Sequence, residues 1–143
     1  MGSQNLASIS GEPMQFTARV LVVEDEPIVG MDIESILAAV GFQVIGPAAS
    51  AAEALELIRV ESVDCALIDY LLTDGDAHDV VARLTDLAVP FAFVTGLSRD
   101  ALPAAFCDVP TVGKPFVASD LLTCVHTMCR QVRGINERRA SRP

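Results

Sequence analysis

Short runs of apolar residues recur along the chain and alternate with longer segments in which apolar positions follow a helical period. The runs are four or five residues long and mostly lack regular polar alternation. They are therefore typical of strands that a parallel sheet buries on both faces. The predicted strands are residues 19–23 (RVLVV), 42–46 (FQVIG), 65–69 (CALID), 91–95 (FAFVT) and 110–113 (PTVG).

Five helices are predicted after these strands. The first follows EDEP and stops at Gly41, the second opens with the capping box SAAE at 50–53, and the third covers 78–84. A short helix containing Pro103 and a long final helix complete the pattern. The apolar positions with helical spacing are Val29, Ile33, Ile36, Leu37 and Val40 in the first helix, Leu55, Leu57 and Ile58 in the second, and Leu121, Leu122, Val125, Met128, Cys129 and Val132 in the last.

This alternation predicts an α/β fold with a parallel sheet covered by helices on both faces. The short connections favour a flavodoxin-like (βα)5 doubly wound sheet with strand order 2-1-3-4-5, and a Rossmann-type order is the main competitor. Residues 1–17 lack periodicity and are predicted to be a flexible leader. Residues 18–133 form the predicted domain, and 134–143 a basic tail or linker stub.

The composition narrows the class of protein. Hydrophobic residues make up 51% of the 143, enough for a core, whereas aromatic residues make up 5%, too few for a base-stacking surface. No apolar run is long enough to cross a bilayer and the N-terminus has no signal-peptide core, so a cytoplasmic location is predicted. Four cysteines without CxxC spacing are predicted to be reduced core residues, namely Cys65, Cys107, Cys124 and Cys129.

The charge is unevenly distributed. The net charge is −9, but residues 130–143 carry five arginines and one glutamate, so the remainder carries −13. Such a body repels nucleic acid, and no direct nucleic-acid binding is expected. The basic tail offers contacts to phosphates, but a solvated helix end is the favoured interpretation.

Charged and polar residues follow four of the predicted strands. Glu24, Asp25 and Glu26 follow the first, Asp69 ends the third, Thr95 ends the fourth, and Lys114 follows the fifth; Lys114 is the only lysine beside nine arginines. Ligands of such folds bind at the carboxyl ends of the strands. Clustered carboxylates repel one another unless a cation joins them, and Mg²⁺ prefers one or two carboxylates with waters and a phosphoryl oxygen. Asp69 is then a candidate nucleophile, and Lys114 offers a compact positive charge that can pair with one phosphoryl group. In an alternative interpretation, Lys114 only neutralises the acidic side chains.

The segments VLVVEDEP, LIDYLLTDGD, FVTG and GKPF, in this order, resemble the receiver domain of two-component response regulators. The resemblance covers about residues 18–133. It implies that Asp69 accepts a phosphoryl group from a phosphohistidine of a sensor histidine kinase or histidine phosphotransferase. It further implies that Glu24, Asp25, Asp69 and the backbone carbonyl of Leu71 hold Mg²⁺. By the same resemblance, Thr95 is the switch hydroxyl, Lys114 pairs with the phosphoryl group, and the Lys114–Pro115 bond is cis.

Some positions depart from the family pattern. Thr111 stands where many receivers carry an aromatic residue three positions before the lysine, so the usual aromatic readout is missing. Gly96 follows Thr95 where alanine is common. The segment resembles alphaproteobacterial single-domain receivers with a Phe-Ala-Thr-Gly-Tyr-like motif, from which Val94 and Leu97 depart. Leu71 and Leu97 offer no polar group to hold an attacking water, which predicts a long-lived phosphorylated state.

Other functions stay open. One alternative is a receiver excised from a longer regulator. The sequence also allows a downstream protein partner and a homodimer. A phosphorylation-independent interaction module is a second class of function. A Mg²⁺-dependent phosphatase that uses Asp69 is a third class, but Leu71 stands where the DxD motif of such phosphatases has its second aspartate, which argues against it. His78 follows a predicted turn and not a Ca²⁺ loop, and His126 is predicted at the surface or rim.

Overall fold

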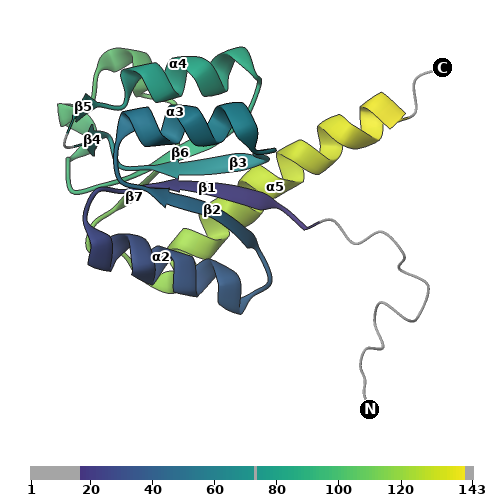
Figure 1. Ribbon diagram of the computed structural model, residues 1–143, viewed down its shortest axis with the longest axis horizontal. Coiled ribbons are helices and arrows are strands. Elements are labelled where there is room, and N and C mark those ends of the chain that lie inside the picture. The colour runs from purple at the N-terminus through teal and green to yellow at the C-terminus, as the bar shows by residue number, and fades with distance from the viewer. Residues whose placement is uncertain (1–16, 73, 141–143) are drawn as a thin grey trace.

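Five parallel strands form a single sheet in the computed structural model, which describes residues 17–72 and 74–140. Their order is β2-β1-β3-β6-β7, as expected for the flavodoxin-like arrangement, so the competing Rossmann-type order is wrong. The central strand is β3, with β1 and β6 on either side of it (Figure 1). The strands are β1 (Arg19–Val23), β2 (Gln43–Ala48), β3 (Cys65–Ile68), β6 (Phe91–Thr95) and β7 (Thr111–Gly113).

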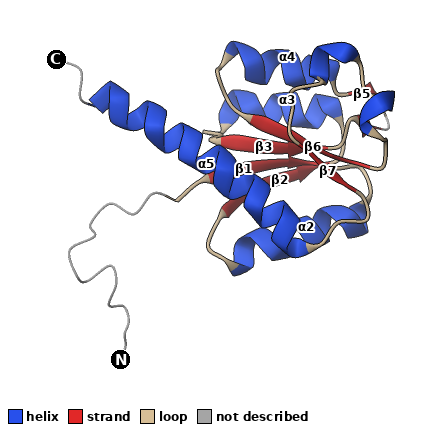
Figure 2. Cartoon of the chain, turned by 180° about the vertical axis from the view of Figure 1, so that it is seen from behind, coloured by secondary structure: helices blue, strands red, loops and turns tan. Residues whose placement is uncertain are grey.

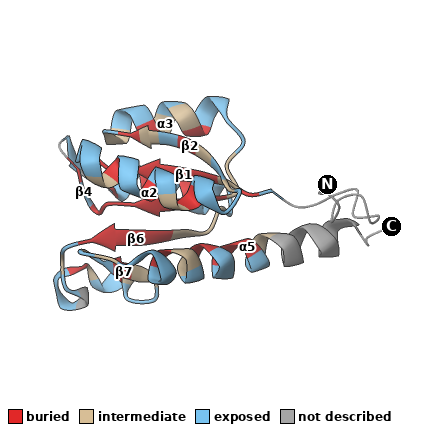
Figure 3. Cartoon of the chain, turned by 90° about the horizontal axis from the view of Figure 1, so that it is seen from below, coloured by how far each residue is buried: buried red, intermediate tan, exposed pale blue. Residues whose placement is uncertain are grey.

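Helices cover both faces of the sheet, two on each side (Figures 1 and 2). The helices are α2 (Pro27–Ala39), α3 (Ala51–Val60), α4 (His78–Asp86) and α5 (Ala118–Ala140). Successive residues of a strand point to opposite faces, so Leu21 and Val23 pack beneath α3 and α4, whereas Val20 and Val22 pack beneath α2 and α5. Figure 3 shows the strands buried between helices whose outer faces are exposed.

The predicted fourth helix is wrong. Two short 3-10 turns, Arg99–Ala101 and Ala104–Phe106, take its place, so the described residues contain four α-helices and not five. Pro103 lies between the turns, where it has no amide hydrogen to donate and disfavours helical geometry in the residue before it. Buried Leu102 and half-buried Phe106 pack into the apolar cluster beneath α3 and α4.

A small hairpin was not predicted. Strands β4 (Leu71–Leu72) and β5 (Gly75–Asp76) pair antiparallel directly after Asp69. Gly75 adopts a φ of +131°, which side chains disfavour, and this permits the reversal. The DGD segment is therefore a turn before a helix, as expected, but it also forms a two-stranded edge beside the site.

Two further details differ from the prediction. Val40 lies beyond the end of α2 and is exposed, so it is not part of the buried face that Ile33 and Leu37 form. Strand β2 extends to Ala48 through Gly46, which has a φ of +99° and where a Cβ atom would lie 2.6 Å from the amide nitrogen of Ala48. Only glycine fits there.

Helix α5 continues through residue 140 and projects past the sheet in Figure 1. It includes most of the segment 134–143, while the predicted leader lies almost wholly outside the described residues. The domain boundaries stay predictions. Among the residues that the structure covers, no helix combines the length and apolar character needed to cross a membrane.

Candidate functional site

Backbone hydrogen bonds continue one residue past three of the strands, and this sets where the next side chains leave the sheet. The donors lie at the carboxyl ends of β1 and β3 and after β7, on one edge. The amides of Glu24, Asp69 and Lys114 donate to the carbonyls of Ala48, Val23 and Thr95 at 2.8, 2.9 and 2.9 Å, respectively. The predicted convergence of strand ends is therefore real, and it follows from parallel strand direction.

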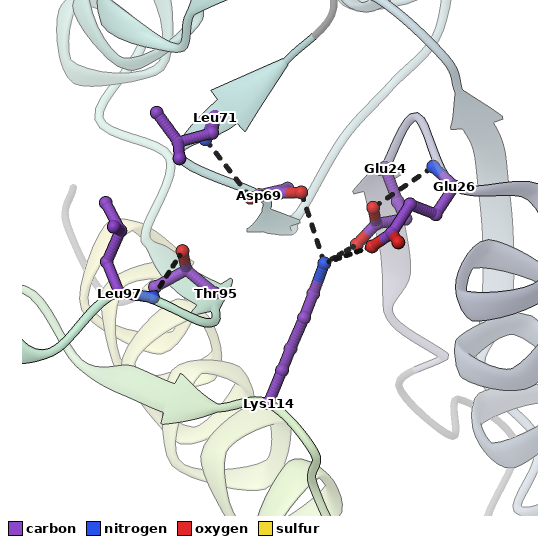
Figure 4. Close-up of polar contacts among 7 residues, drawn as sticks. All are labelled: Glu24, Glu26, Asp69, Leu71, Thr95, Leu97 and Lys114. Atoms are coloured by element: carbon purple, nitrogen blue, oxygen red, sulfur yellow. Dashed lines mark hydrogen bonds and ion pairs between the residues drawn. The ribbon is translucent and has the colours of Figure 1, made fainter.

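Lys114 lies at the centre of this edge (Figure 4). Its Nζ is 2.8 Å from Glu24 Oε1, 3.0 Å from Glu26 Oε1 and 3.2 Å from Asp69 Oδ2. The side chain of Lys114 is 17% exposed, and the Lys114–Pro115 peptide bond is cis, as expected. One ammonium thus neutralises charge from two different strands and from the residue before α2.

Glu24 is almost wholly buried, and burial raises its pKa to about 7 despite the opposing contacts with Lys114 and the Glu26 amide. Its Oε2 accepts a hydrogen bond from the Glu26 amide at 3.2 Å. Its Oε1 is buried without a hydrogen bond, because the contact with Lys114 is an ion pair that lacks hydrogen-bond geometry. Burial alone would lower the pKa of Lys114, but the contacts with Glu24, Glu26 and Asp69 outweigh it and raise that pKa above its usual range.

Glu24, Asp25 and Asp69 form a group able to hold a metal ion, with one carboxylate oxygen of each within 4.8 Å of the others. Carboxylate oxygens are hard ligands that suit Mg²⁺. The buried Glu24 Oε1 without a hydrogen bond is an oxygen that a cation would satisfy. The residues present therefore fit the predicted divalent cation.

Local contacts hold Asp69 and Thr95 in different ways. Asp69 Oδ1 accepts a hydrogen bond from the Leu71 amide at 3.1 Å, which leaves Oδ2 toward Lys114. Thr95 is buried on the same edge, and its hydroxyl accepts from the Leu97 amide at 3.3 Å. Figure 4 shows this threonine pair apart from the Lys114 network. The Thr95 hydroxyl therefore contacts its own loop and is not part of the Lys114 network.

The position of the missing aromatic residue is occupied by half-buried Thr111, whose hydroxyl donates to the Val109 carbonyl at 3.1 Å. Aromatic rings gather elsewhere, on the same side as α4. Tyr70, next to Asp69, contacts Phe93 and Phe106 edge-on at 5.5 and 5.9 Å between ring centroids. The sequence suggested no such cluster, because its members come from three separate segments.

Two further carboxylates, one beside Lys114 and one in the hairpin after Asp69, were given no specific role by the sequence. Glu26 was noted only as a third acid after the first strand, and its contact with Lys114 spans 88 positions along the chain. Asp74, in the hairpin, accepts from the amides of Ala51 and Ala52 at 3.0 and 3.3 Å. The turn-forming DGD segment was the only signal for Asp74.

The remaining candidates lie away from the acidic cluster. His126 is exposed, which confirms a surface position, and its ring contacts that of Phe42 in a tilted arrangement with centroids 5.3 Å apart. His78 is exposed at the start of α4 and contacts Tyr70 at 5.7 Å. Cysteines 65, 124 and 129 are buried or half-buried as expected, but Cys107 is exposed, so its core assignment is wrong; it follows the second 3-10 turn at the surface.

Comparison with known proteins places these features in a family. Residues 20–126 match the family described as the response regulator receiver domain. The transcriptional regulatory protein PdtaR of Mycobacterium tuberculosis is 27% identical over 121 residues, which are 82% of this chain and 59% of PdtaR. The chain therefore spans little more than half the length of that curated relative.

Solved structures agree. The response regulator PhyR from Brucella abortus has a TM-score of 0.73 at 30% identity, covering 95% of this chain and 57% of PhyR. SdrG from Sphingomonas melonis has a TM-score of 0.71 at 29% identity, covering 81% of this chain and 99% of SdrG. With a family match over most of its length, a flavodoxin-like sheet and an acidic cluster at the carboxyl edge, the chain belongs to the response regulator receiver domain family.

Proposed function

We propose that this receiver accepts a phosphoryl group on Asp69 from the phosphohistidine of a sensor histidine kinase or histidine phosphotransferase, and thereby switches its contacts with a downstream protein. The observation that supports this most directly is the position of Asp69. Its carboxylate is buried within the group that fits a cation, and Oδ2 lies 3.2 Å from the only lysine. A cytoplasmic location is proposed with this function, since such donors present their phosphohistidine there.

The transfer is a displacement at phosphorus. A carboxylate oxygen of Asp69 forms the new P–O bond while the P–N bond to the donor imidazole breaks, and the imidazole leaves with the electron pair and takes up a proton. Mg²⁺, held by Glu24, Asp25, Asp69 and the Leu71 carbonyl, would neutralise charge between the carboxylates and the incoming group. Lys114 binds a phosphoryl oxygen and stabilises the added charge of about −1.5 to −2.

Thr95 supplies the switch in this proposal. Its hydroxyl releases the hydrogen bond that it accepts from the Leu97 amide and instead donates one to a phosphoryl oxygen. This change moves the loop after β6. Because Lys114 is bonded through its amide to the carbonyl of Thr95, the loop after β7 is coupled to the same movement. The 3-10 turns, β7 and α5 would present the altered surface to the partner.

The test is phosphorylation by a small-molecule donor. Wild type, Asp69→Asn and the control Asp86→Asn, which changes an exposed residue at the end of α4, are incubated with Mg²⁺ and acetyl phosphate, and intact masses are recorded. We expect one added phosphoryl group in wild type and Asp86→Asn and none in Asp69→Asn. Modification of Asp69→Asn would move the site elsewhere, and phosphoramidate serves as a second donor if acetyl phosphate modifies none of the three.

The lifetime of the phosphorylated state is a separate prediction. Leu71 is 51% exposed beside Asp69 and Leu97 is half-buried, so neither provides a polar group for an attacking water. Decay in Mg²⁺ should therefore take far longer than seconds. Replacing Leu71 with Gln should accelerate decay by about tenfold, less than the roughly hundredfold of a full general base. Decay of wild type within seconds would contradict the role of the two leucines.

A further inference from the structure

Lys114 contacts three carboxylates, and they are not equivalent. Glu24 and Asp69, whose side chains are 1% and 8% exposed, belong to the group that fits a cation. Glu26, whose side chain is 62% exposed, is outside that group. A bound cation would therefore share Glu24 and Asp69 with the Lys114 ammonium, but it would not share Glu26.

Cation binding and the resting position of Lys114 compete. A doubly charged ion bound by Glu24, Asp25 and Asp69 repels a nearby ammonium and draws the same oxygens toward itself. Lys114 lies 2.8 and 3.2 Å from two of these carboxylates, so it is ion-paired with oxygens that the ion would also use. Without another partner, Lys114 would either exclude the ion or leave the site.

Glu26 is placed to be that partner. Its carbonyl accepts from the Gly30 amide at 3.0 Å in the first turn of α2, which fixes its backbone. Lys114 is fixed at its own backbone by the Thr95 carbonyl at 2.9 Å. Glu26 and Lys114 both line the groove between α2 and the loop after β7. Figure 4 shows the two side chains pointing toward one another.

We propose that Glu26 is a positioning residue for Lys114: it holds the ammonium beside Asp69 while a divalent cation occupies the other carboxylates, and yields it to the phosphoryl group on transfer. This inference rests on the proposed function. It assigns the third acid of the EDE segment a role distinct from metal binding. Glu26 thus makes the cation and the lysine compatible in one small site.

Calorimetric titration with Mg²⁺ at pH 8 tests the inference, with circular dichroism as the check on folding. Glu26→Gln should weaken Mg²⁺ binding about two- to fivefold, the range of a partly exposed ion pair, because Lys114 then falls back on Glu24 and Asp69. Glu34→Gln, which removes an exposed carboxylate elsewhere on α2, should match wild type. Equal affinity of Glu26→Gln and wild type would overturn the proposal.

Glu26→Asp separates contact from charge. It keeps the negative charge but shortens the reach by one methylene, so it should resemble Glu26→Gln if the contact with Lys114 matters. Wild-type affinity in Glu26→Asp would show that Glu26 acts only as a distant charge, and would overturn the positioning role. A wild-type protein that binds no Mg²⁺ would instead overturn the proposed function and, with it, this inference.

Discussion

At the scale of single residues, Glu24 has the environment that departs furthest from that of a surface carboxylate. It is 2% exposed, it faces Asp69, and it is stabilised in its charged form chiefly by Lys114. The result is a pKa of about 7, raised by burial from an ordinary value of 4.5. In the absence of a cation, the native state therefore holds this proton to higher pH than the unfolded chain does.

The sign of the resulting pH dependence follows from that difference. The contribution of Glu24 to the free energy of unfolding is present in full below about pH 4.5 and is lost as the pH rises through about 7. A cation needs the charged carboxylate, so Mg²⁺ affinity changes in the opposite direction. We expect Mg²⁺ to bind about tenfold more tightly at pH 8 than at pH 6, as titration of one ligand near pH 7 requires.

Calorimetry at the two pH values measures this, with Glu24→Gln as the control. The variant should bind more weakly overall and show a flatter pH profile, because it has no proton to lose at that position. A wild-type affinity that is the same at pH 6 and pH 8 would contradict the raised pKa of Glu24.

At the scale of elements, the start of α3 shows how the hairpin after Asp69 is connected to the rest of the fold. The Ser50 hydroxyl accepts from the Glu53 amide at 3.1 Å, which confirms the predicted cap. The Glu53 carboxylate returns to the Ala49 amide at 3.0 Å, one residue earlier than in the usual capping box. Asp74 from the hairpin satisfies the two amides that Ser50 does not reach.

Loss of the Ser50 cap should destabilise α3 measurably. We expect Ser50→Ala to lower the free energy of unfolding by about 1 kcal/mol, since one amide at the helix start loses its acceptor. Urea denaturation measures the change, and Ser62→Ala, in an exposed segment, is the matched control. An effect no larger than that of Ser62→Ala would mean that Asp74 and Glu53 hold the helix start by themselves.

At the scale of the whole molecule, one sheet separates two apolar clusters. Leu84 of α4 is fully buried on one face and Leu37 of α2 is fully buried on the other. Both clusters include residues of β1, since alternate positions of that strand point to opposite faces. Neither cluster can be lost without exposing strands that the other needs, so the domain should unfold as one unit.

Truncation on either face tests this cooperativity. Leu37→Ala and Leu84→Ala should each lower the free energy of unfolding by about 2–5 kcal/mol, from lost burial and the cavity left behind. Urea titration followed by circular dichroism and by hydrogen exchange should give a single transition for each variant. Two separate transitions in either variant would show that the faces unfold independently.

The sheet and the convergence of its acidic edge could be predicted from the sequence, because short apolar runs and parallel direction determine both. The 3-10 turns could not, since a segment as short as ALPAAF carries no periodicity that distinguishes them from an α-helix. The β4–β5 hairpin was missed because two-residue strands have no alternation to recognise. The Lys114–Glu26 contact depends on how two long side chains meet after folding, which spacing along the chain does not encode.

The single lysine also has an analytical consequence. Apart from the two histidines, every other basic side chain in this protein is an arginine, so reagents that methylate primary amines have only Lys114 and the α-amino group as targets. Methylation keeps the positive charge. Isotope-labelled methyl groups would therefore place a nuclear magnetic resonance probe at the centre of the site without any substitution. Its chemical shift would report, in one spectrum, whether the ammonium faces carboxylates, a cation or a phosphoryl group.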